Sequence, residues 1–212
     1  FSFSVLSGAT SRSNLSLKIT GANRLLLIAC FQNVDDVDFT GYANGKRWKL
    51  VSIIEDQNPG ITAGYIIAPP EGDVSIEVEA RNLGLSTSTV RVFVVALADC
   101  DQTSGIRGDA VATGTSTTPS LSITSAVSDL VIDFLSHANA TASLGAGQTL
   151  ILSAETPDAR SSQEDGASPS VTMSWLLGSS VAWKLGAFSV QPQAVYYLED
   201  ADSVATYGRR AE

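Results

Sequence analysis

The acidic side chains of the chain could serve either metal binding or acid–base catalysis. Asp35, Asp36 and Asp38 share one polar loop, and Asp99 and Asp101 flank a cysteine further along the chain. Calcium is held in proteins by clustered oxygen ligands, and loops commonly supply them. The first trio is therefore our candidate calcium site, although its spacing is not that of an EF-hand. An acidic loop that is merely solvated is the alternative, and no other cofactor is indicated.

Catalytic groups are sparse. A nucleophilic triad needs a base beside its nucleophile, and the only histidine, His137, follows an apolar segment, where we expect a turn residue. Glu77 and Glu79 share one face of an alternating segment, so exposure to solvent explains both. Asp133 interrupts an apolar segment; we expect it to face solvent, with a buried functional acid as the alternative. Hydrolysis of a glycoside by two carboxylates is a minor alternative, and we predict that the protein is not an enzyme.

Aromatic side chains offer a binding surface. Tyr42, Trp48 and Tyr65 lie around a predicted hairpin, and Trp48 stands between two basic residues. Exposed aromatic rings with polar neighbours are typical of carbohydrate-binding sandwiches, so these three are the candidate ligand-binding residues. Trp175 and Trp183 have apolar neighbours at strand spacing, and we expect them in the core.

Two similar segments organise the rest of the chain. The run Asn23–Phe31 is too apolar to be wetted on either face, which predicts a strand inside a sheet. The run Asp129–Ser136 repeats this character. Each follows an amphipathic strand, Ser16–Thr20 in one case and Ser120–Thr124 in the other. An amphipathic strand, a turn and a buried strand therefore occur twice.

The remaining pattern is that of about ten short strands separated by turns. Asn44-Gly45 predicts a tight hairpin, because both residues tolerate positive φ. The stretch Asp99–Thr118 reads as a long polar connection with a short strand at Ala110–Thr113, and Glu155–Ser168 reads as an exposed excursion. No segment has a helical period. We predict an all-β, jelly-roll-like antiparallel β-sandwich over residues 1–192, with pseudo-repeated halves near 10–100 and 115–192.

Composition excludes some partners. The chain has 13 Lys+Arg against 22 Asp+Glu, and a net charge of -9 disfavours binding to nucleic acid. No run is long enough to span a membrane. Cys30 closes one apolar strand and Cys100 follows another, where free buried thiols are expected; a disulfide is the alternative if the strand ends are neighbours. Because the sequence begins without methionine, we expect a processed chain or a segment of a longer one.

Five motifs stand out along the chain: Asn23–Ile28, the Asn44-Gly45 hairpin, Tyr65-Ile-Ile-Ala-Pro-Pro-Glu-Gly72, Ser128–Asp133 and Trp183–Pro192. In this order they resemble the motifs of jelly-roll domains in virion proteins of tailed phages and in phage-like bacterial genes. The resemblance covers roughly residues 10–192. It implies a structural protein of the head or tail, located in the extracellular particle, with other virion proteins, copies of itself and host glycans as partners. The family pattern carries no catalytic residues.

The end of the chain differs from the rest. Pro192 ends the predicted sandwich, and residues 193–212 have little to bury, which indicates a C-terminal linker or docking arm. Aromatic residues carry much of the energy of protein interfaces. The candidate interface residues are Tyr196, Tyr197, Tyr207, Arg209 and Arg210. The first functional hypothesis is a non-enzymatic virion structural protein, and the alternative is an extracellular carbohydrate-binding module used for attachment.

Overall fold

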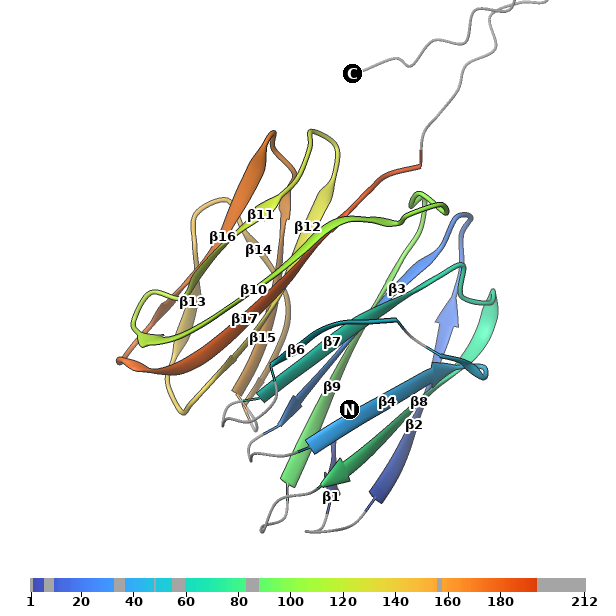
Figure 1. Cartoon of the computed structure of the whole chain (residues 1–212), viewed down its shortest axis with the longest axis horizontal. Helices are drawn as coiled ribbons and strands as arrows, with labels where there is room; N and C mark the ends of the chain where they lie inside the picture. Colours follow the sequence, from blue (N-terminus) through green and yellow to red (C-terminus); the bar gives the residue numbers. More distant parts are fainter. Residues whose placement is uncertain are drawn as a thin grey trace, which may run out of the picture.

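The computed structural model of the chain describes residues 2–5, 10–32, 37–47, 49–54, 60–82, 88–155 and 158–193. These ranges form strands β1 to β17 and contain no helix, so nothing in them could cross a membrane as a helix. Every strand pairing described is antiparallel (Figure 1). The predicted all-β antiparallel sandwich is confirmed.

The first half of the chain forms two sheets. The five-stranded sheet has the order β1 (Ser2–Val5), β9 (Ser88–Leu97), β3 (Leu25–Gln32), β7 (Gly60–Ile67) and β6 (Lys49–Ile54). The four-stranded sheet has the order β2 (Thr10–Ile19), β8 (Gly72–Asn82), β4 (Val37–Ala43) and β5 (Lys46–Arg47).

The second half forms two further sheets. The five-stranded sheet has the order β10 (Ile106–Ser116), β17 (Val181–Val190), β12 (Leu130–His137), β15 (Asp158–Asp165) and β14 (Thr149–Glu155). The three-stranded sheet has the order β11 (Ser120–Thr124), β16 (Ser170–Leu177) and β13 (Ala142–Leu144). Figure 1 shows the two pairs of sheets side by side.

Strands that are far apart in the sequence pair as nested hairpins. In the first half β1 pairs with β9, β2 with β8 and β3 with β7. In the second half β10 pairs with β17, β11 with β16 and β12 with β15. A long hairpin folded over into two facing sheets gives this nesting. The repeat seen in the sequence is therefore a repeat of topology.

Each half of the chain has its own pair of sheets and its own core, and we call the halves the first and the second sandwich. One buried cluster lies inside the first sandwich, where Leu26 and Ile28 of β3 pack against Val74, Ile76 and Val78 of β8. A second cluster lies inside the second sandwich, between β12 and β17 on one side and β11 and β16 on the other. Apolar side chains from facing sheets thus form a separate core in each half.

A third cluster joins the two sandwiches, because their five-stranded sheets pack against each other. We call this contact the seam. Its aromatic centre consists of Phe31 and Phe93 from the first half and Phe134 and Phe188 from the second. The ring centroids of Phe31 and Phe134 are 6.4 Å apart, in an edge-to-face arrangement that is favourable for aromatic pairs. Strand β3 therefore has a core on each face, which confirms the burial predicted from its sequence.

Two stretches differ from the prediction. Ile106–Ser116 was expected to be mostly a polar connection, but it is one long strand paired with β17. Half-buried and exposed residues alternate along it, and the alternation is hard to see in the sequence because half-buried positions are held by small residues such as alanine. Asp158–Asp165, expected to be an exposed excursion, is strand β15 between β12 and β14. Its serine side chains are buried because they bond to the neighbouring strand: Ser161 Oγ donates to the carbonyl oxygen of Asp133 at 2.7 Å.

The cysteines lie in different cores. Cys30 is buried in the first sandwich, and Cys100 is buried in the seam cluster. Both are free thiols, so no disulfide joins them. The arm predicted over 193–212 lies outside the described residues, apart from Gln193.

Candidate functional site

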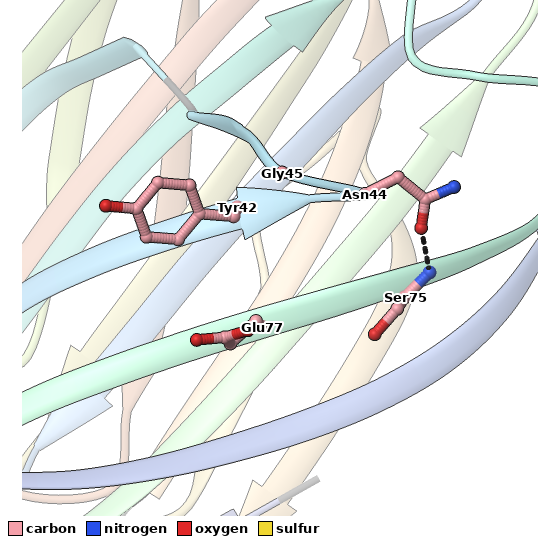
Figure 2. Close-up of a pocket in the computed structure, with 5 residues that line it drawn as sticks. All are labelled: Tyr42, Asn44, Gly45, Ser75 and Glu77. Atoms are coloured by element: carbon pink, nitrogen blue, oxygen red, sulfur yellow. Dashed lines mark hydrogen bonds between the residues drawn. The ribbon is translucent and has the colours of Figure 1, made fainter.

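The hairpin between β4 and β5 is built as its sequence predicts. Asn44 and Gly45 have φ values of 46° and 80°, and Ala43 pairs with Lys46 across the turn. The turn is also bonded to β8. Asn44 Oδ1 accepts a hydrogen bond from the Ser75 backbone N–H at 2.8 Å (Figure 2). The Asn44 backbone N–H donates to the Ser75 carbonyl oxygen at 3.0 Å. Two hydrogen bonds to the backbone of β8 thus hold the hairpin on the sheet.

A hollow of about 380 Å³ lies beside this turn. Its described lining consists of Tyr42, Asn44, Gly45, Ser75 and Glu77. Tyr42 and Glu77 are direct partners across β4 and β8, and Figure 2 shows both side chains extending to the same side. Both are half-buried, whereas the residues that alternate with them, such as Ala43 and Ile76, are fully buried in the core. The hollow therefore lies on the outer face of the four-stranded sheet.

A row of unlike polar groups runs along the outer face at the hollow, from Glu77 and Tyr42, which line it, to Arg47 beyond its described lining. Tyr42 pairs with Glu77 on one side and with Arg47 on the other. The row thus offers an aromatic ring between a hydrogen-bond acceptor and a charged donor. Glu77 is the only carboxylate among the described lining residues, whereas glycoside hydrolysis requires two. The arrangement suits binding of a hydroxylated ligand.

The second half has no such row. The two halves can be aligned through the pairing of β8 with β2 and the pairing of β16 with β11. In this alignment Leu176 occupies the position that Glu77 has in the first half. Ser143 pairs with Leu176 and so corresponds to Tyr42. The ring and the carboxylate are therefore features of the first sandwich, and the second provides a natural control.

The predicted ligand-binding residues do not converge. Tyr42 lines the hollow, but Tyr65 lies on the opposite sheet, is 8% exposed and packs edge-on to Phe188 in the seam. Trp48 lies outside the described residues.

The other predicted sites fall largely outside the described ranges. Asp35 and Asp36 of the predicted calcium site lie outside the described residues. Of Asp38 only the backbone is described, and it lies opposite Arg81 on β8. Within the described part of the chain, no group of three metal-ligating side chains converges. The candidate interface residues also lie outside it: Tyr196, Tyr197, Tyr207, Arg209 and Arg210.

His137 is the last residue of β12 and is 2% exposed, so it is not the turn residue expected. Its Nδ1 lies 4.0 Å from Asp158 Oδ2, and burial lowers the pKa of the imidazole. The ring is enclosed by the fold, which leaves it without access to a substrate.

Asp133 is fully buried, which contradicts the expectation that it faces solvent. Its Oδ1 accepts hydrogen bonds from the backbone N–H and the hydroxyl of Ser162, both at 2.8 Å. Its Oδ2 accepts one from Trp175 Nε1 at 2.7 Å. At the corresponding place in the first half, three residues after the first residue of the strand, stands Ile28. The acid therefore replaces an apolar core residue and is satisfied by neighbours within the second sandwich.

Burial raises the pKa of Asp133 to about 6 from an ordinary value of 3.8, against the opposing effect of its hydrogen bonds. Between these two values the native state holds a proton that the unfolded chain has released. The resulting stability is present at low pH and is lost as the pH rises through about 6. We expect the free energy of unfolding of the wild type, relative to Asp133→Asn, to fall by about 2 kcal/mol between pH 4 and about 7.5.

Denaturant unfolding of both proteins across this range measures the difference. Placing an amide beside Trp175 can change the free energy of unfolding by itself, but this change is the same at every pH. It therefore does not affect how the difference between the two proteins varies with pH. A wild-type minus Asp133→Asn difference that is flat with pH would contradict the prediction.

No protein-family model and no curated protein matches the sequence. Among solved structures, the chain is similar to an anti-sigma factor domain-containing protein from Clostridium clariflavum, with 10% identity, a TM-score of 0.27 and coverage of 88% of this chain and 84% of that one. It is also similar to an FMN-binding beta-glucuronidase from Facaelibacterium prausnitzii L2-6, with 9% identity, a TM-score of 0.28 and coverage of 89% and 32%. Similarities this weak say nothing about the function of this protein.

Proposed function

We propose that the protein is a non-enzymatic attachment module that binds carbohydrate in the hollow beside the β4–β5 hairpin. The observation that supports this is the row formed by Glu77, Tyr42 and Arg47 on the outer face of the first sandwich. An aromatic face can pack against the C–H face of a sugar ring. Charged groups beside it form strong hydrogen bonds with hydroxyls.

The rigidity of the site supports the same proposal. The hairpin is bonded to β8 through Asn44 and Ser75, so the ring and the carboxylate are held on paired strands before a ligand arrives. A site that is ordered in advance loses less conformational entropy on binding.

The test is a glycan-array screen of the full chain, followed by titration of the best glycan. Tyr42→Ala should lower the affinity by about tenfold or more, since the stacking surface is lost. Leu176→Ala, at the corresponding place in the second half, should leave the affinity unchanged. Equal binding by wild type and Tyr42→Ala would contradict the proposal.

A second candidate is assembly, as expected of a virion structural protein that contacts copies of itself or other virion proteins. The outermost strands β10 and β14 of one sheet carry Val111 and Leu150, which are 38% and 47% exposed. Outer strands present backbone groups to which another chain can add. Light scattering should then show a discrete oligomer that Leu150→Lys dissociates, whereas a monomer at every concentration would contradict this role.

A further inference from the structure

A second hollow, of about 430 Å³, adjoins strand β5 of the hairpin, and we call it the basic cleft. One wall comes from β5, β6 and β7, and the other from the connection that leads into β10. Its described lining consists of Lys46, Arg47, Lys49, Tyr65, Ile66, Ile67, Thr103, Ser104 and Ile106. The cleft thus combines residues from both sides of the junction between the sandwiches.

The charge of the cleft is opposite to that of the chain. Lys46, Arg47 and Lys49 are all exposed, and no carboxylate is among the described lining residues, although the chain carries a net charge of -9. The ion pairs found in the described ranges use other cations, such as Arg24 with Glu71 and Arg107 with Asp129. The positive charge of the cleft is therefore not neutralised by the side chains that line it.

The two lysines are positioned by contacts with β7. Lys46 Nζ donates to the carbonyl oxygen of Ile67. Lys49 Nζ lies 5.6 Å from the centroid of the Tyr65 ring, a cation–π distance. These contacts hold the ammonium groups near the cleft without neutralising their charge.

The opposite wall is fixed by hydrogen bonds. Asp101 Oδ1 accepts from the backbone N–H groups of Ser104 and Thr103, at 2.8 and 2.9 Å, and these bonds hold the pKa of Asp101 below its usual value. Gln191 Nε2 donates to Ser104 Oγ at 2.7 Å. The wall therefore presents two hydroxyl-bearing residues on a bonded loop.

From these features we infer that the basic cleft binds a small organic carboxylate of the size of a uronic acid. The cations would bind the carboxylate, and the hydroxyl-bearing wall would bind polar groups of the ligand. Ile66, Ile67 and Ile106 add an apolar lining, which favours a ligand with a carbon body over a fully hydrated inorganic anion. Lys46 and Lys49 are among the described lining of this cleft alone, whereas Arg47 also ends the row beside the carbohydrate hollow. The inference does not rest on carbohydrate binding in that hollow.

The experiment is calorimetric titration of the full chain with glucuronate, glucose and inorganic phosphate. Glucuronate should bind saturably, at least about tenfold more tightly than either of the others, and its affinity should fall with added salt. Lys46→Gln/Lys49→Gln should weaken it by about tenfold or more, and Lys46→Arg/Lys49→Arg should restore it. Lys18→Gln on β2 and Tyr42→Ala should leave it unchanged, and the Tyr42 variant separates this site from the hollow.

Three results would overturn the inference. One is the absence of glucuronate binding, and another is equal affinity for glucose or phosphate. The third is an affinity for glucuronate that is unchanged in the folded Lys46→Gln/Lys49→Gln variant.

Discussion

Phe134→Ala should lower the free energy of unfolding by about 4 kcal/mol, because it opens a cavity at the centre of the seam. Phe134 is completely buried. Its ring lies 6.4 Å from that of Phe31 in the first sandwich and 6.3 Å from that of Phe188 in the second. Denaturant unfolding measures the loss, and Leu176→Ala, at an exposed position, should cost far less.

A double-mutant cycle tests whether the contact between Phe31 and Phe134 across the seam contributes to stability. Phe31→Ala and Phe134→Ala should couple by about 1 kcal/mol, as expected for an aromatic pair in contact. A coupling energy of zero would show that the two sandwiches are stabilised independently, which contradicts the packing described.

Arg107→Met should lower the free energy of unfolding by about 3 kcal/mol, because it leaves the buried carboxylate of Asp129 without its cation. Arg107 donates to both oxygens of Asp129, from Nε at 2.5 Å and from Nη2 at 3.1 Å. Asp129 also accepts from the Ala126 N–H and from Ser189 Oγ, both at 2.9 Å. The pair thus joins β10, β17 and the turn before β12.

Lys18→Met is the matched control, because it removes an exposed cation and should change stability by less than about 0.5 kcal/mol. Denaturant unfolding at neutral pH compares the two variants. Equal effects would contradict the role given to the pair of Arg107 and Asp129.

The sequence patterns that predict structure correctly are those with a local physical cause. The apolar run of β3 predicts burial on both faces, and the Asn44-Gly45 pair predicts its hairpin, because each depends on neighbouring residues alone. Strict alternation along β8 places Glu77 on the outer face. Which strand lies beside β8 depends on long-range pairing, so the meeting of Tyr42 with Glu77 could not be predicted.

The wrong expectations for β15 and Asp133 share a cause, because polar side chains within a strand do not always face solvent. Ser161 and Ser162 are buried because they bond to Asp133, and Asp133 is buried because Ser162 and Trp175 donate to it. Such mutual satisfaction exists only once the strands are paired. The one signal in the sequence for the burial of Asp133 is the repeat itself, because it aligns Asp133 with the apolar Ile28.

Amide chemical-shift mapping of the full chain with the glycan selected by the array locates the binding site. The proposal predicts saturable shifts concentrated on the residues of the hollow, namely Tyr42, Asn44, Gly45, Ser75 and Glu77. Shifts that saturate elsewhere, with these residues unmoved, would contradict it.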